Sequence, residues 1–223
     1  MAGENSIDRN LWEYKMKQVF IHGLGQTANS WDKTISGLKN KENILCPNLA
    51  DLVQTGEANY GNLFSNFSDL CNQSDKPIDV CGLSLGSVLA LNYAIEYPNR
   101  VRSLILIAPQ YRMPKKILQF QNIIFSFMPK SMFKTTGFNK ADFIQLCKSM
   151  MKLDFSCSIS KITCPVLVIY GEKDTANKKA AIELSRKLKN GVLKVITHSG
   201  HEVNIDTPKR LAKLICAFYD HIS

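Results

Sequence analysis

The sequence lacks a long apolar stretch: no uninterrupted hydrophobic run reaches the ~20 residues that a membrane-spanning helix needs. The first residues, MAGENSIDRNLWEYKMK, are polar and contain no apolar core of signal-peptide length. We therefore expect a soluble protein of the cytoplasm that does not insert stably into a membrane.

Paired cysteines are also missing. The chain has seven cysteines, an odd number, and no CxxC motif. A disulfide framework normally uses an even number of cysteines in a secreted chain, so we expect all seven to be reduced. Cys46, Cys81 and Cys164 lie in or beside apolar runs, where a thiol behaves as a small hydrophobic group.

Acidic residues are fewer than basic ones, and the formal net charge is +9. Such a charge can indicate a nucleic-acid partner, but most basic residues are dispersed. The two main clusters, Lys178–Lys189 and Lys209–Lys213, alternate with apolar residues at helical spacing, which is typical of solvated helix faces. No RNA- or DNA-binding motif accompanies them, so we expect a small-molecule partner and no nucleic acid.

What the chain does have is a regular alternation of strand-like and helix-like segments, which predicts an α/β fold. With 223 residues, 45% of them hydrophobic, the chain is long enough for one compact domain, residues 1–223. The predicted strands are Met16–His22, Asn43–Cys46, Ile78–Leu83, Ser103–Ala108, Val166–Tyr170 and Leu193–Thr197. The predicted helices are Ser30–Leu38, Tyr60–Cys71, Ser84–Tyr97, Asn177–Leu188 and Pro208–Tyr219. Most strands are continuous apolar runs, which favours a mostly parallel central sheet with helices on both faces.

One segment, residues 109–161, interrupts the alternation. It contains no clear strand, is rich in aromatic and aliphatic residues, and is divided by Pro114 and Pro129. A connection of this length usually has a function or a small fold of its own. We interpret it as a short helical cap inserted over the carboxyl edge of the sheet, and we call it the cap segment. The alternative is extra core packing, and the two are compatible.

A strand followed at once by a G-x-S-x-G motif and a helix is the strongest chemical signal. The predicted strand Ile78–Leu83 leads into Gly82-Leu83-Ser84-Leu85-Gly86. Such a turn needs glycines beside the serine and presents its hydroxyl at a helix N-terminus, where negative charge is stabilised. We therefore predict that Ser84 is a nucleophile and that the Leu85 N–H helps to bind the oxyanion.

A serine nucleophile needs a base, and the chain has four histidines. His201 follows Gly200 in the loop between the last predicted strand and the last helix, so it can reach the serine. His198, in the same loop, is the rival. His221, near the C-terminus, is predicted to be inert.

The base needs a carboxylate to orient it. Asp174 stands just past the predicted strand Val166–Tyr170, and Glu172 is the alternative. Along the chain the three residues then follow the order Ser84, Asp174, His201. This order of nucleophile, acid and base is the one found with a G-x-S-x-G turn between a strand and a helix.

A second oxyanion donor should come from the loop His22-Gly23-Leu24-Gly25-Gln26, whose glycines allow a close approach of the backbone. Leu24 N–H is the candidate. His22 is predicted to brace this loop by hydrogen bonds, and a catalytic role for His22 is the lesser alternative.

The segments HGLGQTANSW (22–31), GLSLGS (82–87), YGEKDTAN (170–177) and SGHEVNIDTP (199–208) resemble the α/β-hydrolase superfamily. Within it the chain is similar to small carboxylesterases and monoacylglycerol-lipase-like enzymes. The resemblance implies an eight-stranded, mostly parallel sheet, with the first two strands abbreviated here and Leu11–Tyr14 as their only remnant. It also implies catalysis without a metal or organic cofactor.

The leading hypothesis is a serine hydrolase that cleaves a carboxylic ester through an acyl-enzyme intermediate. A thioesterase or a C–C bond hydrolase would use the same three residues, so these activities stay open. A ligand-binding receptor or an inactive scaffold with the same fold is the alternative outside enzymes.

Overall fold

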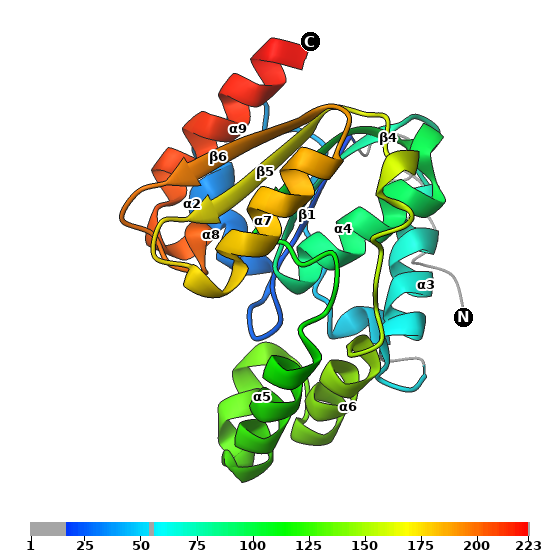
Figure 1. Cartoon of the computed structure of the whole chain (residues 1–223), viewed down its shortest axis with the longest axis vertical. Helices are drawn as coiled ribbons and strands as arrows, with labels where there is room; N and C mark the ends of the chain where they lie inside the picture. The colour runs from blue at the N-terminus through cyan, green and yellow to red at the C-terminus, as the bar shows by residue number, and fades with distance from the viewer. Residues whose placement is uncertain (1–16, 54–55, 223) are drawn as a thin grey trace, which may run out of the picture.

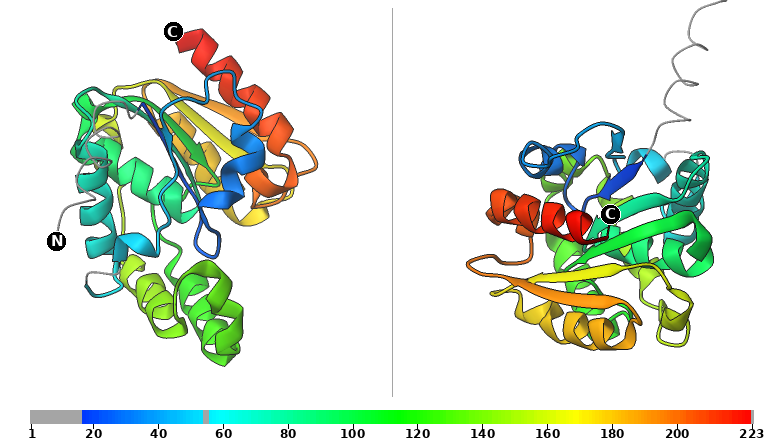
Figure 2. Two further views of the ribbon diagram at one scale, coloured as in Figure 1. Left: turned by 180° about the vertical axis from the view of Figure 1, so that it is seen from behind. Right: turned by 90° about the horizontal axis from the view of Figure 1, so that it is seen from above.

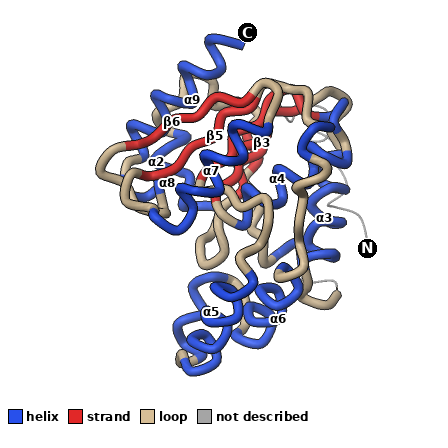
Figure 3. The backbone as a smooth tube through the Cα atoms, viewed as in Figure 1, coloured by secondary structure: helices blue, strands red, loops and turns tan. Residues whose placement is uncertain are grey.

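A sheet of six parallel strands forms the centre of the computed structural model, which describes residues 17–53 and 56–222 (Figures 1 and 3). The strand order is β2-β1-β3-β4-β5-β6. The strands are β1 (Gln18–Ile21), β2 (Ile44–Leu45), β3 (Ile78–Leu83), β4 (Val101–Ile107), β5 (Val166–Gly171) and β6 (Gly191–Ile196). All five neighbouring pairs are parallel.

The six strands lie where the sequence predicts them, with ends that differ by one or two residues. The expectation of eight strands is wrong for the part of the chain that the structure describes, which contains six. The predicted remnant Leu11–Tyr14 lies outside the described residues.

Helices cover both faces of the sheet, as predicted (Figure 2). The helices are α2 (Asp32–Ile35), α3 (Tyr60–Asn72), α4 (Leu85–Glu96), α5 (Lys115–Phe127), α6 (Lys140–Met150), α7 (Thr175–Lys187), α8 (Val203–Asp206) and α9 (Pro208–Ile222). Successive residues of a strand point to opposite faces of the sheet. In β4, Leu104 and Leu106 belong to the core that includes α3, α4 and α7, whereas Ile105 and Ile107 belong to the core that includes α9.

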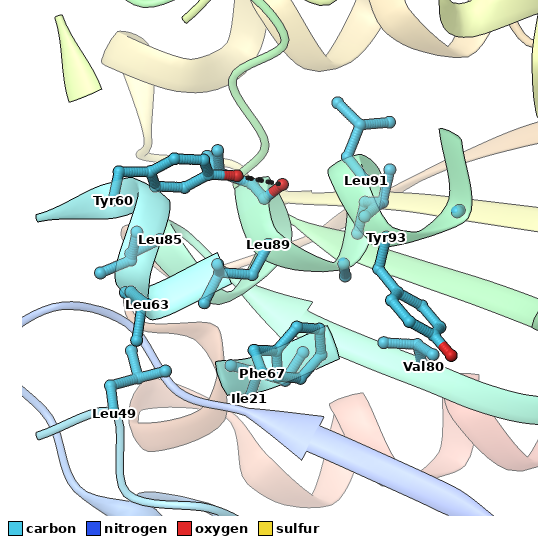
Figure 4. Packing of buried hydrophobic residues seen from close by; sticks show 14 of the residues in the cluster. Ile21, Leu49, Tyr60, Leu63, Phe67, Val80, Leu85, Leu89, Leu91 and Tyr93 are labelled. Atoms are coloured by element: carbon cyan, nitrogen blue, oxygen red, sulfur yellow. Dashed lines mark hydrogen bonds between the residues drawn. The ribbon is translucent and has the colours of Figure 1, made fainter. Parts of the chain in front are cut away.

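The larger of the two cores surrounds α4, which is apolar on nearly all sides and buried between β3 and α3. Figure 4 shows Phe67 of α3 and Tyr93 of α4 packed together, with ring centroids 5.8 Å apart in an edge-to-face arrangement. In the same view the Tyr60 hydroxyl donates a hydrogen bond to the Val88 carbonyl (3.4 Å). This packing holds the helix that begins beside Ser84.

One helix prediction needs correction, and one short helix was not predicted. The predicted helix Ser30–Leu38 is a 3-10 turn, Ala28–Trp31, followed by the single-turn α2. The chain there forms i to i+3 hydrogen bonds, such as Ser30 N–H to Thr27 O (3.0 Å), which tighten the first turn. The short helix α8 was not predicted, because four residues carry too little periodicity to detect.

The cap segment forms α5 and α6, joined by a 3-10 stretch, Lys130–Thr136, and projects beyond one edge of the sheet (Figures 1 and 3). Phe143 of α6 makes edge-to-face contacts with Phe125, Phe133 and Phe138, at centroid distances of 5.1, 5.0 and 6.3 Å. Phe133, Phe138 and Phe143 are also part of the larger core. The segment therefore contributes to core packing.

Among the described residues, none of the helices is both long and apolar enough to cross a bilayer.

Asp79 is a carboxylate in the middle of the sheet, fully buried on β3. Its oxygens accept hydrogen bonds from the Arg102 guanidinium, through Nε (2.9 Å) and Nη2, and from the Ser103 hydroxyl (2.6 Å). A buried charge is tolerated only when it is paired and hydrogen-bonded. The pair therefore ties the beginning of β4 to β3.

Replacing Arg102 with alanine should lower the free energy of unfolding by about 2–3 kcal/mol, because Asp79 loses its cation while it stays buried. Urea unfolding at neutral pH measures this loss. The double variant Asp79→Asn, Arg102→Ala should recover part of the stability, and Arg210→Ala, at an exposed arginine, should cost much less. An Arg102→Ala variant within about 0.5 kcal/mol of the wild type would contradict this account.

Candidate active site

Ser84 occupies a strained turn between two regular elements. β3 ends at Leu83, α4 begins at Leu85, and Ser84 between them has φ 54° and ψ −114°. Its N–H donates to the Ile107 carbonyl of the neighbouring strand (2.9 Å). A non-glycine residue at positive φ typically costs about 1–3 kcal/mol and persists only where its surroundings enforce it.

The flanking glycines make this turn possible. A Cβ on Gly82 would lie 2.1 Å from the Gly86 carbonyl oxygen, and a Cβ on Gly86 would lie 2.2 Å from the Ile21 carbonyl oxygen. Both distances are far below contact distance, so any side chain would force the backbone apart. The two glycines therefore have the steric function that the sequence motif predicts.

Ser84 opens into a cavity of about 290 Å³ beneath the cap segment. His201 lines the same cavity. Most of the remaining wall is apolar and comes from the loop after β1, from α4 and from the cap segment: Leu24, Leu85, Val88, Met113, Leu118, Phe125, Phe143, Cys147 and Met150. The volume is at the lower end of the range for small-molecule sites, about 300–1,000 Å³.

His201 lies beside the carboxylate that the sequence predicts for it. Its Nδ1 is 2.9 Å from Asp174 Oδ2. Asp174 is 5% exposed, whereas the His201 side chain is 42% exposed. An Nδ1–H donated to a carboxylate leaves Nε2 unprotonated in the neutral ring, so that Nε2 can accept a proton.

Asn177 is a further member of this group that the sequence analysis did not identify. Its side-chain amide donates to both oxygens of Asp174 (3.0 and 2.9 Å), and its Nδ2 also lies 3.0 Å from His201 Nδ1. The amide oxygen accepts a hydrogen bond from Gln110 (2.8 Å). Burial alone would raise the pKa of Asp174, but the hydrogen bonds from His201 and Asn177 outweigh burial and lower it.

The start of α7 corrects another prediction. The predicted helix Asn177–Leu188 begins two residues earlier, at Thr175, and its capping residue is Asp174, whose side chain accepts the Asn177 N–H (3.2 Å). The same carboxylate therefore caps a helix and orients His201.

The two predicted oxyanion donors come from different elements, and both residues line the cavity. Leu85 is the first residue of α4, where N–H groups have no partner within the helix. Leu24 lines the cavity from the loop after β1. His22 braces this loop as predicted: its Nδ1 lies 2.8 Å from the Gly23 carbonyl, and its Nε2 accepts the Leu49 N–H (3.1 Å). Because both ring nitrogens are engaged, His22 has none left for a substrate.

A buried amide network joins this loop to the loop that carries His201. The side chains of Gln26 and Asn204 exchange two hydrogen bonds (3.2 and 3.1 Å), and Gln26 also donates to Glu202 (3.0 Å). Asn204 is fully buried and also donates to the Ser30 hydroxyl (3.1 Å). The sequence analysis missed this network, because a buried amide and an exposed one look alike in a single sequence.

The rival candidates occupy other positions. His198 is exposed, with φ 62°, and its N–H donates to the Glu172 side chain (3.0 Å). Glu172 thus caps the His198 turn, while Asp174 holds His201. His221 is exposed on the last turn of α9.

Two observations limit the other chemistry of this cavity. Burial raises the pKa of the Cys147 thiol, which lines the cavity, to about 12, so the thiol is neutral at pH 7 and packs as an apolar group. Across the described residues, no three His, Cys, Asp or Glu side chains gather as a metal ion would require. All seven cysteines are free, as predicted.

Known proteins resemble the chain over nearly its whole length. The model of the alpha/beta hydrolase family matches residues 18–214. Monoacylglycerol lipase ABHD6 from Bos taurus is 21% identical over 254 residues, which cover 92% of this chain and 75% of the relative. A thermophilic esterase from Thermogutta terrifontis superposes with a TM-score of 0.75 at 18% identity, over 94% of this chain and 91% of the esterase. MenH from S. aureus superposes with a TM-score of 0.78 at 14% identity, over 94% and 95% of the two chains.

The state of His22 gives stability a defined pH dependence. Burial lowers the pKa of His22, although the Gly23 carbonyl and Asp51 oppose the shift. The unfolded chain, with the ordinary pKa of about 6.5, then binds a proton more readily than the folded chain. The free energy of unfolding should therefore lose nothing to His22 above pH 6.5. It should fall as the pH drops below that value, because the unfolded chain then gains a proton at His22 that the folded chain does not.

Urea unfolding between pH 7 and pH 5 measures this dependence. His22→Gln keeps a side-chain acceptor for Leu49 but cannot titrate, so its decline should be shallower, by at most about 1.4 kcal/mol per pH unit. His221→Gln, at an exposed position, is the matched control and should decline as the wild type does. Equal slopes for the wild type and His22→Gln would refute the assignment.

Proposed function

The chain belongs to the alpha/beta hydrolase family, and we propose that it is a serine hydrolase that cleaves carboxylic esters through an acyl-enzyme intermediate. In this proposal Ser84 is the nucleophile, His201 the general base and Asp174 the residue that orients the base. The N–H groups of Leu24 and Leu85 bind the oxyanion.

The observation that carries the proposal is the shared cavity. Ser84, held at φ 54°, and His201, held 2.9 Å from Asp174, line one apolar space of about 290 Å³. A nucleophile, an oriented base and room for an acyl group are the three requirements of acyl transfer. Relatives and structural neighbours with lipase and esterase activity support the same reaction class.

In the first half of the reaction, His201 Nε2 takes the hydroxyl proton of Ser84 as Oγ attacks the ester carbonyl. The Nδ1–H bond to Asp174 fixes the tautomer and stabilises the imidazolium that forms. The carbonyl oxygen becomes an oxyanion, which the N–H groups of Leu85 and Leu24 stabilise beside the positive end of α4. His201 then gives its proton to the departing alkoxide, and the acyl group stays on Ser84.

In the second half, water takes the position of the alcohol. His201 accepts a proton from this water as the water attacks the acyl carbonyl, and the carboxylic acid leaves as the proton returns to Ser84. The half-exposed imidazole gives water access to Nε2 while Asp174 stays buried. The buried carboxylate, with its pKa lowered by hydrogen bonds, remains ionised throughout the turnover.

Ser84→Ala should lower kcat for a p-nitrophenyl ester by about a thousandfold or more, because removal of the nucleophile leaves only the oxyanion donors and binding. Circular dichroism should be unchanged, because Ser84 contributes no side-chain packing to the core. A fluorophosphonate probe should label the wild type and leave Ser84→Ala unlabelled.

Ser87→Ala is the matched control for this experiment. Ser87 directly follows the G-x-S-x-G motif, but its hydroxyl donates to the Ser84 carbonyl (2.7 Å), and the residue is buried. The control protein should still be labelled. Labelling that persists in Ser84→Ala would place the nucleophile at another serine. A folded wild type that neither reacts with the probe nor hydrolyses esters would favour a ligand-binding role.

The cap segment should set the acyl-chain preference. Phe125 lines the cavity, whereas Phe127 of the same helix is 84% exposed and does not line it. With about 0.8 kcal/mol for each methylene that enters an apolar pocket, the wild type should prefer short-to-medium acyl p-nitrophenyl esters over acetate. Phe125→Leu should shift the optimum to longer chains, because it vacates volume in the cavity.

Phe127→Ala is the matched control and should leave the chain-length profile of kcat/KM unchanged. A wild-type profile that peaks at acetate and declines steadily would show that the cavity does not bind the acyl chain. Equal shifts in the two variants would show that the cavity wall is not what sets the preference.

A further inference from the structure

A second, larger cavity adjoins the one over Ser84. Its volume is about 920 Å³, and it is lined by α7 and by the two linkers that join the cap segment to the sheet, residues 109–114 before α5 and residues 151–158 after α6. The linkers pair there through backbone hydrogen bonds, Met113 N–H to Leu153 O (3.0 Å) and Phe155 N–H to Tyr111 O (2.8 Å). Four residues line both cavities: Gln110, Met113, Pro114 and Ala176. The two spaces therefore adjoin along these four residues.

This second cavity, which we call the basic groove, is rich in cations. Arg112, Lys115, Lys152 and Lys179 line it, against two carboxylates, Asp154 and Glu183. Its formal charge is therefore +2.

The two carboxylates already have partners. Glu183 accepts a hydrogen bond from the Tyr111 hydroxyl (2.8 Å) and lies 4.0 Å from Lys179, and Asp154 accepts the Ser156 N–H (2.9 Å). In the part of the chain that the structure describes, no ion pair within 4.0 Å involves Arg112, Lys115 or Lys152. These three cations thus have no close ion-pair partner there, although, in addition to the hydrogen bonds from Ser156, Arg112 and Lys115 attract Asp154 at longer range and help to lower its pKa.

The whole cap segment has the same charge bias. Residues 109–161 contain nine lysines and arginines, two aspartates and no glutamate, so they account for seven of the nine net positive charges of the chain. The nine basic residues are spread along the segment, so no local cluster in the sequence reveals this concentration. Most of the net positive charge of the chain therefore lies in the segment that contributes to the wall of the cavity over Ser84.

The carbonyl carbon of an ester carries two substituents, the acyl chain and the alcohol part, which extend from it in different directions. In the proposed function the acyl part occupies the apolar cavity, so the alcohol part must extend into the space that adjoins it. We propose that the basic groove binds this leaving part and that the leaving part carries a phosphate group; the inference depends on the proposed function. Phosphate matches the groove, because it has two negative charges and several acceptor oxygens for an arginine fork and lysine ammonium groups.

Two kinds of leaving group share this chemistry. A glycerol phosphate leaves through oxygen, and a nucleotide-bearing thiol such as coenzyme A leaves through sulfur. The same steps serve both: Ser84 Oγ forms the bond to the carbonyl carbon, the C–O or C–S bond breaks, and His201 protonates the departing atom.

Steady-state kinetics on two matched substrate pairs tests the proposal. One pair is 1-hexanoylglycerol and 1-hexanoylglycerol 3-phosphate, and the other is hexanoyl-pantetheine and hexanoyl-coenzyme A. The short acyl chain keeps all four substrates monomeric. The phosphate-bearing member of at least one pair should have a kcat/KM about tenfold higher, mainly through KM, and the difference should shrink as salt is added. The pair with the larger effect identifies the leaving atom.

Two variants locate the effect. The double variant Lys115→Gln, Lys152→Gln should lose most of the difference in kcat/KM between the phosphate-bearing and the neutral substrate. Its kcat/KM on the neutral substrate should be unchanged, because neither lysine lines the cavity over Ser84. Lys130→Gln is the matched control: it removes a charge from the same segment outside the groove and should keep the preference. Equal losses in both variants would show general attraction by the segment and would overturn the groove assignment.

Failure of this inference differs from failure of the proposed function. If the wild type hydrolyses 1-hexanoylglycerol but shows no phosphate preference in either pair, the groove proposal is wrong and the ester hydrolase stands. If it hydrolyses none of the four substrates and does not react with a fluorophosphonate, the proposed function is wrong, and the groove proposal falls with it.

Discussion

The close approach of three backbone segments at the Ser84 turn is the constraint on which the site depends. Gly86 lies against the carbonyl of Ile21, and Gly82 lies against Gly86, with no room for a side chain at either glycine. Ile21 is the last residue of β1, so the loop that follows it, with Leu24, is held beside the turn. The contact that strains Ser84 thus also positions the second oxyanion donor. One steric requirement fixes two functional groups with respect to each other.

A similar contact holds the proposed base at the same carboxyl edge of the sheet, two strands away from the Ser84 turn. A Cβ on Gly171, the last residue of β5, would lie 2.0 Å from the Gly200 carbonyl oxygen, so the loop before His201 packs directly on the strand that leads to Asp174. The Gln26–Asn204 hydrogen bonds then connect this loop to the oxyanion loop. Backbone contacts and buried amides therefore set the distances between the groups, and the reacting side chains need little freedom of their own.

The sequence reveals the parts of the site that short-range rules govern. A buried strand, two glycines around Ser84 and a carboxylate just past a strand end follow from local sterics, so the strands and the candidates Ser84, Asp174 and His201 could be predicted. Partners that depend on the packing of distant loops could not: in the sequence Asn177 is only the start of a predicted helix, and the Gln26–Asn204 pair spans 178 residues. Composition also reveals that the cap segment is apolar but not which of its side chains are covered, so the exposure of Phe127 could not be predicted.

The sheet and the cap segment hold their functional residues by different means. Ser84, Asp174 and His201 lie on elements locked by backbone contacts, where most substitutions disturb the fold. The cap segment instead joins the sheet through two short linkers and packs mainly through side chains such as Phe125 and Phe143. Side-chain packing tolerates changes of volume and surface charge better than backbone contact tolerates an added Cβ. The cavity wall and the basic groove can therefore vary in shape and charge while Ser84, Asp174 and His201 keep their geometry, so in the proposed enzyme the cap segment would set the substrate preference and the residues at the sheet edge would carry out the reaction.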